Sequence, residues 1–313
     1  MKIVFMGTPS FAVTSMQKIL ESEHEIVGVV TVPDKPQGRG KKLLPSPVKL
    51  AAQEANLCPI LQPEKLKDTA FIEQLKALNA DLFVVVAFRI LPPEVFQIPP
   101  MGTINLHASL LPEYKGAAPI NWVLFNGEKK TGVTTFLINE GVDTGKILLQ
   151  QEVEITEDET AGSLHDKLAV LGAKLLVETL DKLEANEITP LAQPEGNYKK
   201  APKLTKEIQI IDWSLPGQII KQRIHGLSPV PGAITTFRGK RVKIYRVELI
   251  SEDVSNDKRA SGVIHSVSPD VLIVSTGDLS YISIKEIQFE GKKKMSIEEA
   301  IRGYRFEPGE QFG

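Results

Sequence analysis

Three polar side chains between residues 102 and 145 could together perform acyl-transfer chemistry. Asn105 and His107 stand two positions apart in an apolar segment predicted to be a strand, so their side chains share one face. Asp143 lies in a glycine-flanked turn after a later strand, where its carboxylate can reach the imidazole. An amide and an imidazolium stabilise a developing oxyanion, and a carboxylate orients the imidazole and helps to remove a proton.

The same residue types also permit a purely structural interpretation. A polar side chain inside an apolar sheet is unfavourable unless it is hydrogen-bonded or used in function. A satisfied histidine beside a turn asparagine meets that condition as well as a catalytic pair does. Residue types alone leave both interpretations open.

The sequence around these residues resembles the signature of the folate-dependent formyltransferases. Three separated blocks agree with that signature in order and spacing, at residues 105–112, 115–120 and 141–145. Members of this family move a formyl group from 10-formyltetrahydrofolate to an amine. The resemblance therefore implies 10-formyltetrahydrofolate as the formyl-donor substrate, with no metal.

The resemblance also implies roles for individual residues. Asn105, His107 and Asp143 would form the catalytic trio. The folate-binding loop would consist of Ser109, Leu110, Leu111 and Pro112. Two positions depart from the family pattern: Lys115 stands where arginine is usual, and residues 88–89 are Phe-Arg where an aromatic residue followed by glycine is common.

The likeness extends over essentially the whole chain and is strongest to the branch that formylates initiator methionyl-tRNA for translation initiation. It rests on the start of the chain at residues 5–9, on the loop at 33–42 and on the second domain. It implies initiator methionyl-tRNA and 10-formyltetrahydrofolate as partners, with no membrane and no obligate protein partner.

Two groups of basic residues favour a long polyanionic partner. The segment from Asp34 to Lys49 carries five basic residues against one acid, and Gly38 and Gly40 are predicted to make it a mobile loop that closes over a nucleic-acid end. The residues predicted to contact tRNA are Lys35, Arg39, Lys41 and Lys42 in this loop and Arg238, Lys240, Arg241 and Lys243 on a later hairpin. A solvated loop and edge-strand charges that discourage aggregation are the plainer alternatives.

Other function classes fit the sequence less well. A sugar-nucleotide formyltransferase acting on a UDP-amino sugar shares the trio and the folate donor, but its substrate offers only two phosphates to the basic loop. A glycinamide ribonucleotide formyltransferase has no need of residues 205–313, and a non-catalytic tRNA-binding protein has no need of the trio. The motif Gly-x-Gly-x-x-Gly is absent after the first strand, which argues against a dinucleotide. The remaining histidines lack metal-ligand spacing, so no catalytic metal is expected.

The elements that must position the trio alternate between strand and helix over the first 190 residues. Continuous apolar runs at residues 2–7, 25–31 and 81–87 are typical of strands covered on both faces, as in a parallel sheet. The predicted fold class is therefore α/β, with a Rossmann-like, open and mostly parallel sheet. In such sheets, ligands bind outside the carboxyl ends of the strands.

The pattern changes after residue 189. Residues 190–204 contain three prolines and one glycine and are predicted to be a linker. Short strands and turns then predict a small OB-like β-barrel. The predicted organisation is a formyltransferase catalytic domain at 1–189, which binds the folate and the aminoacyl end, and an OB-like tRNA-binding domain at 205–313.

Composition places the chain among soluble globular proteins. It has 313 residues, of which 42% are hydrophobic and 24% are charged, a balance that excludes intrinsic disorder. One cysteine, Cys58, excludes a disulfide framework and suits a reducing compartment. No apolar run approaches the ~18 residues that span a bilayer, and the N-terminus turns polar too early for a signal peptide. The predicted location is cytoplasmic.

Overall fold

The computed structural model describes residues 1–37, 42–250 and 260–313, and the chain divides into two compact units. Unit 1 comprises Met1–Pro119, Lys130–Glu154 and His165–Ala201, and unit 2 comprises Ile120–Lys129, Ile155–Leu164 and Pro202–Gly313. Most of the segment expected to be a linker, up to Ala201, therefore packs as part of unit 1.

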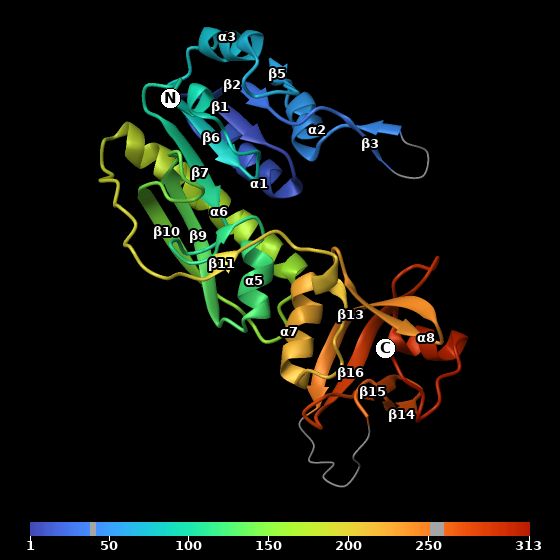
Figure 1. Cartoon of the computed structure of the whole chain (residues 1–313). Coiled ribbons are helices and arrows are strands. Elements are labelled where there is room, and N and C mark those ends of the chain that lie inside the picture. The colour runs from blue at the N-terminus through green and yellow to red at the C-terminus, as the bar shows by residue number, and fades with distance from the viewer. Residues whose placement is uncertain (38–41, 251–259) are drawn as a thin grey trace. The chain divides into compact units, whose positions relative to one another are not determined.

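Unit 1 is built on a seven-stranded sheet with the strand order β10-β9-β7-β6-β1-β2-β5 (Figure 1). The strands are β1 (Lys2–Gly7), β2 (Glu25–Val30), β5 (Ile60–Leu61), β6 (Leu82–Val86), β7 (Thr103–His107), β9 (Lys130–Leu137) and β10 (Ile147–Glu154). The five strands from β7 to β5 run parallel, whereas β9 is antiparallel to β7 and to β10. The predicted mostly parallel α/β sheet is confirmed.

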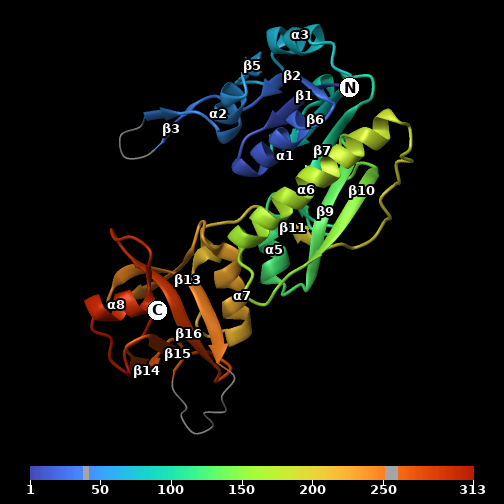
Figure 2. The same ribbon diagram turned by 180° about the vertical axis from the view of Figure 1, so that it is seen from behind.

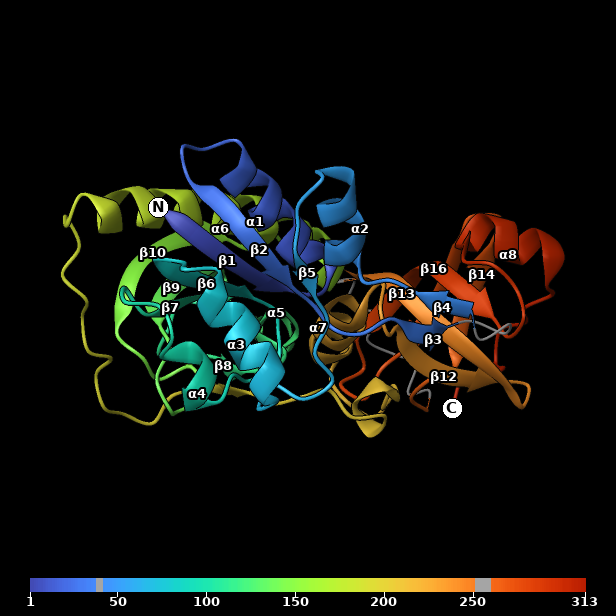
Figure 3. The ribbon, with the colours of Figure 1, turned by 90° about the horizontal axis from the view of Figure 1, so that it is seen from above.

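Strand β6 is buried along its whole length, and β1 from Ile3 onward, because helices cover both faces of the sheet. The helices are α1 (Ser10–Leu20), α2 (Pro47–Glu54), α3 (Thr69–Ala77), α4 (Pro93–Phe96) and α6 (Ala161–Glu184). Figure 3 shows α1 and α6 on one side of the sheet and α3 and α4 on the other. Alternate residues of β1, Val4 and Met6, pack with Phe71 of α3 and Val95 of α4 in one buried apolar cluster.

The carboxyl ends of β1, β6 and β7 meet at one edge of the sheet. In the sheet, Gly7 is paired with Val86, and Val86 is paired with Leu106. His107 follows Leu106, so it lies one residue past the paired ends of β1 and β6. A Cβ at Gly7 would lie 2.7 Å from the Cβ of Ala12, so the start of α1 can approach this edge only because residue 7 has no side chain. This edge is where an open α/β sheet binds its ligands.

The basic loop is bordered by a short hairpin that the sequence did not predict. Strands β3 (Lys35–Gln37) and β4 (Lys42–Leu44) pair antiparallel on either side of residues 38–41. Arg39 and Lys41, two of the predicted tRNA contacts, lie outside the described residues.

Lys49 is engaged within the fold. It belongs to α2, and its Nζ donates to Asp34 Oδ2 at 2.8 Å. Hydrogen bonds from Lys49 and from Gln62 lower the pKa of the Asp34 carboxyl below its ordinary value. Lys49, one of the five basic residues between Asp34 and Lys49, thus has an acidic partner within the chain.

Unit 2 is built on an antiparallel sheet with the strand order β12-β13-β16-β15-β14, with β17 added to β16. The strands are β12 (Ala233–Phe237), β13 (Lys240–Ile250), β14 (Ile264–Ser268), β15 (Val271–Ser275), β16 (Tyr281–Phe289) and β17 (Met295–Ser296). Near the C-terminus, Phe312 bridges to Phe237 of β12 and Gln311 bridges to Val263 beside β14. The C-terminal segment therefore links the two ends of the sheet. The predicted second domain of short strands is confirmed, and its sheet is antiparallel.

Two helices pack on this sheet (Figure 2). Helix α7 (Gly217–Leu227) lies along β13, and α8 (Ile297–Gly303) contacts β16. Ile220 and Ile224 of α7 are buried in the apolar core of the unit. Lys221, also buried, lies 3.4 Å from Glu157, which ties segment 155–164 to α7.

The N-terminus of α7 is held by a carboxylate from a distant turn. Asp278 Oδ1 accepts hydrogen bonds from Gly217 N at 3.2 Å and from the hydroxyls of Thr276 and Ser280, both at 2.7 Å. Burial opposes ionisation of this carboxyl, but the hydrogen bonds prevail and lower its pKa to about 2. Asp278 therefore acts as an ionised cap for the helix.

We expect Asp278→Ala to lower the free energy of unfolding of unit 2 by about 1 kcal/mol at pH 7, the usual cost of losing a helix cap. Because the pKa falls from 3.8 to about 2 on folding, the contribution of the charge is present above pH ~4 and is lost as the pH falls toward 2. Both tryptophans, Trp122 and Trp213, lie in unit 2, so urea unfolding followed by tryptophan fluorescence reports on this unit. Equal destabilisation at pH 7 and pH 3 would show that the charge of Asp278 contributes nothing.

Candidate active site

His107 is the buried centre of the candidate site. Only 7% of its side chain is exposed, and its Nε2 lies 2.9 Å from the carbonyl oxygen of Tyr114. A carbonyl oxygen only accepts hydrogen bonds, so this contact assigns the proton to Nε2. The other ring nitrogen, Nδ1, then faces Asp143.

The imidazole and the carboxylate lie close together but are not hydrogen-bonded. His107 Nδ1 lies 3.9 Å from Asp143 Oδ2, beyond hydrogen-bond distance. The same Oδ2 accepts a hydrogen bond from Gly116 N at 2.9 Å, which fixes the carboxylate. In enzymes without bound substrate, hydrogen bonds between groups that act together are often this long, and they tighten when substrate binds.

The local sequence around Asp143 forces a tight turn. Asp143 has φ of +54°, in the left-handed region that aspartate tolerates better than most residues. A Cβ at Gly145 would lie 1.5 Å from the carbonyl oxygen of Leu137, so no other residue fits there. The turn predicted from the flanking glycines thus delivers the carboxylate to the edge where His107 lies.

Asn105 lies on the same strand face as His107. It is half-buried on β7, between Val85 of β6 and Phe136 of β9. Across residues 1–37, 42–250 and 260–313, no side-chain hydrogen bond engages its amide. The amide can therefore bind an oxygen of a substrate at this edge.

The predicted folate-binding loop follows β7, and Thr134 and Gln150 hold its main chain. Thr134 Oγ1 donates to the carbonyl oxygen of Ser109 at 2.7 Å and accepts from Leu111 N at 3.1 Å. Gln150 Nε2 donates to the carbonyl oxygen of Leu111 at 2.8 Å. Neither Thr134 nor Gln150 was predicted to belong to the site. The structure reveals Thr134 because it is paired with His107 in the sheet.

The residues predicted to contact tRNA differ in their exposure and in their partners within the chain. Lys35, Lys240 and Arg241 are exposed. Arg238 pairs with Glu310 at 2.6 Å, and Lys243 Nζ donates to the carbonyl oxygen of Pro231 at 2.6 Å. Burial and the nearby Arg241 lower the pKa of the Lys243 ammonium.

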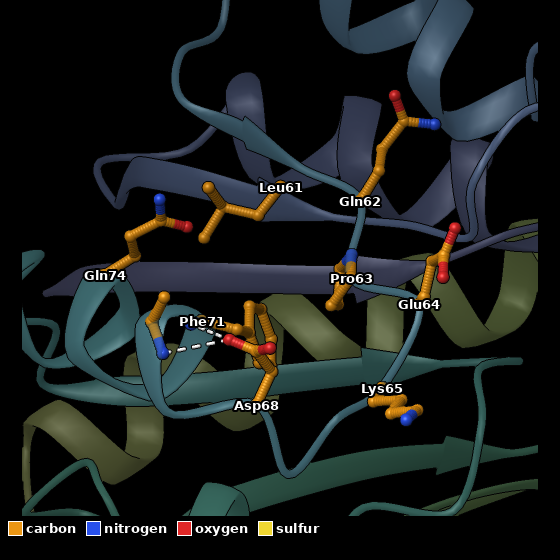
Figure 4. A pocket seen from close by; sticks show the side chains of 9 residues that line it. Leu61, Gln62, Pro63, Glu64, Lys65, Asp68, Phe71 and Gln74 are labelled. Carbon is orange, nitrogen blue, oxygen red and sulfur yellow. Dashed lines mark hydrogen bonds between the residues drawn. The ribbon is translucent and has the colours of Figure 1, made fainter.

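A cavity of about 470 Å³ lies beside β5 and α3 (Figure 4). It is lined by Leu61, Gln62, Pro63, Glu64, Lys65, Asp68, Ala70, Phe71 and Gln74, none of which belongs to the predicted site. Arg89 donates hydrogen bonds to the carbonyl oxygens of Pro63 and Glu64, and burial lowers the pKa of its guanidinium. Residue 89, one of the two family departures, therefore supports the wall of this cavity.

Neither a metal site nor a membrane-spanning helix is found in the described ranges. No group of three or more His, Cys, Asp or Glu residues there is arranged to hold a metal ion. None of the helices described is both long enough and apolar enough to cross a membrane.

Comparison with known proteins decides the family. The profile described as "Formyl transferase" matches residues 1–180, and the profile described as "Formyl transferase, C-terminal domain" matches residues 203–305. The chain belongs to the formyltransferase family. The family predicted from the three sequence blocks is therefore confirmed.

Full-length relatives and solved structures of formyltransferases are similar to this chain. A methionyl-tRNA formyltransferase of Alkaliphilus oremlandii is 46% identical over 314 residues, covering 100% of both chains. One of Clostridioides difficile is 47% identical over 310 residues, covering 99% of each. The structure of an N-formyltransferase of Helicobacter canadensis with folinic acid and dTDP-3-aminofucose is 20% identical, with a TM-score of 0.66 over 91% of this chain and 98% of that one. This last likeness concerns the fold alone.

Replacing Asn105 or His107 of β7 tests the part of that residue in formyl transfer. We expect His107→Ala and Asn105→Ala each to lower the rate of formyl transfer by roughly 10²–10³, the usual effect of removing one donor to an oxyanion. The rate is measured at saturating substrate, and circular dichroism checks that the fold is intact. Near-normal turnover in either variant would remove that residue from the mechanism.

Replacing Asp143 separates a catalytic role from a binding role. Asp143→Asn keeps the size of the side chain and its acceptor oxygen for Gly116 N but removes the charge that faces His107. We expect kcat to fall by at least about tenfold while folate affinity stays within a few-fold, because the loss is confined to the transition state. A weaker folate affinity with unchanged kcat would make Asp143 a binding residue.

Proposed function

We propose that the chain transfers the formyl group of 10-formyltetrahydrofolate to the free α-amino group of initiator methionyl-tRNA. The products are N-formylmethionyl-tRNA, used in cytoplasmic translation initiation, and tetrahydrofolate. The observation that carries the proposal is the 46–47% identity to methionyl-tRNA formyltransferases over the whole chain. The amide, imidazole and carboxylate at the carboxyl edge of the sheet supply independent support.

In the proposed reaction, each residue of the trio has its own role. The amine nitrogen attacks the formyl carbon, so a nitrogen–carbon bond forms and the formyl oxygen becomes an oxyanion. Asn105 donates a hydrogen bond to that oxygen, and protonated His107 stabilises its charge through Nδ1. Asp143 holds His107 and helps to accept the amine proton, directly or through water. The carbonyl then reforms, the bond from the formyl carbon to folate N10 breaks, and N10 takes up the proton that the amine has lost.

In this proposal, the two domains bind different parts of the substrates. Residues 1–189 form the catalytic domain, with the folate held by the loop at 109–112 and the methionine amine at the trio. Residues 205–313 bind tRNA, and the segment 190–204 that joins the two domains packs with unit 1 up to Ala201. The exposed Lys35, Lys240 and Arg241 support a phosphate-binding role.

A direct comparison of acceptors tests the proposed substrate. The protein is offered 10-formyltetrahydrofolate with charged initiator tRNA and, separately, with a UDP-amino sugar or dTDP-3-aminofucose. We expect kcat/KM for the charged tRNA to exceed that for either sugar nucleotide by at least about 10³, because phosphates of a long polyanion add binding sites that a nucleotide sugar lacks. Preferential transfer to an amino sugar would replace the proposal with its sugar-nucleotide alternative.

The basic loop gives a second test that leaves the folate site intact. We expect the joint change of Arg39, Lys41 and Lys42 to Ala to raise KM for charged tRNA and to lower kcat, since a loop that closes on the acceptor end also positions the amine. Removing one side chain that binds a phosphate flattens the log–log salt dependence by about 0.9 for a duplex and by about 0.7 for a single strand.

A matched variant controls for the loss of charge. Replacing Lys292, Lys293 and Lys294 by Ala also removes three positive charges, from a turn with no predicted tRNA contact. We expect this variant to keep the salt slope and KM of the original protein, and folate affinity to be unchanged in both variants. Equal salt slopes in the loop variant and the original protein would mean that the loop is only solvated.

A further inference from the structure

The loop that carries Asp143 is clamped by a side chain from the segment after α6. Gln193 Nε2 donates hydrogen bonds to the carbonyl oxygens of Asp143, at 3.0 Å, and of Gly145, at 2.8 Å. Both partners only accept, so the contact needs a group with two N–H donors on one nitrogen. A side-chain amide supplies that group, and a carboxylate of the same size does not.

The segment around Gln193 is itself anchored to unit 1 on both sides. Leu191 exchanges two main-chain hydrogen bonds with Ile147 of β10, at 2.8 and 2.9 Å. Further along, β11 (Lys200–Ala201) pairs in parallel with β8 (Lys115–Gly116). Gln193 therefore lies in a loop segment whose main chain is held on both sides.

Two contacts hold Asp143, one from Gln193 in this segment to the main chain of the turn and one from Gly116 in β8 to the carboxylate. Gln193 fixes the main chain of residue 143, whose left-handed φ is +54°. Gly116 N, which donates to Asp143 Oδ2 at 2.9 Å, lies in the strand that β11 holds. A Cβ at Gly116 would lie 2.4 Å from the carbonyl oxygen of Ala201, so this pairing depends on glycine. Removing the Gln193 clamp frees the turn to move while Gly116 stays in place.

We propose that Gln193 is a positioning residue for formyl transfer, which holds Asp143 at its 3.9 Å separation from His107 by binding the two carbonyl oxygens of the turn. The inference rests on the proposed role of Asp143. Gln193 acts through the turn and has no part in binding either substrate. A displacement of a catalytic group by about 1 Å can slow a reaction about 10²-fold, so loss of the clamp affects the rate.

Two substitutions of similar size separate the donors from the packing. Gln193→Met keeps the length and removes both donors, and Gln193→Glu replaces the donors with acceptors that repel the two carbonyl oxygens. We expect kcat to fall roughly ten- to a hundredfold in both, with the Glu variant the slower, and KM for charged tRNA and for 10-formyltetrahydrofolate to stay within about threefold. The control is Leu191→Ser, because the residue is 62% exposed and its bridge to Ile147 uses main chain only. It should keep the kcat of the original protein.

A double-variant comparison tests whether Gln193 acts through Asp143. In an Asp143→Ala background, Gln193→Met should change kcat by less than about twofold, because the group it positions is gone. The proposal would be overturned by a full additional loss of kcat in the Asp143→Ala background. It would also be overturned by an unchanged kcat in both Gln193 single variants, or by effects confined to KM. If Asp143→Ala alone left kcat unchanged, the proposed role of Asp143 itself would fail, so the two failures are distinguishable.

Discussion

The buried imidazole of His107 is the group on which the rest of the candidate site depends. A ring nitrogen inside a sheet edge must be hydrogen-bonded, and here the carbonyl oxygen of Tyr114 accepts from it at 2.9 Å. That contact requires the chain after β7 to turn back on itself, which it does with Tyr114 in the left-handed region at φ +58°. Because Nε2 is occupied, Nδ1 is the nitrogen that faces Asp143 and the one that acts in the proposed mechanism.

Meeting this requirement brings together three segments that are far apart in the sequence. The turn after β7 supplies Tyr114, the glycine-rich turn before β10 supplies Asp143, and the segment after α6 holds both turns. Tyr114 N donates to the carbonyl oxygen of Lys199 at 2.7 Å, and Lys199 N donates to Glu113 at 2.8 Å. Much of the site is thus fixed by hydrogen bonds that involve main-chain atoms.

The sequence predicted what depends on periodicity and on residue type, and it missed what depends on main-chain partners. The apolar runs around β1, β2 and β6 predicted buried parallel strands, and the glycines around Asp143 predicted its turn. The β3–β4 hairpin escaped because Pro36 and flanking charges are unusual in strands. Gln193 escaped because its partners are carbonyl oxygens about fifty positions away, which no pattern of side chains reveals. The roles of Asn105, His107 and Asp143 stay predictions.

In the proposed mechanism, His107 and Asp143 act as one unit at the edge of the sheet. The most direct test is the single-turnover rate of formyl transfer to methionyl-tRNA in four proteins: the original chain, His107→Ala, Asp143→Ala and the double variant. If the carboxylate works through the imidazole, the double variant is about as slow as the slower single variant. If the two losses multiply, each residue acts on the substrate independently and the account of a coupled pair is contradicted.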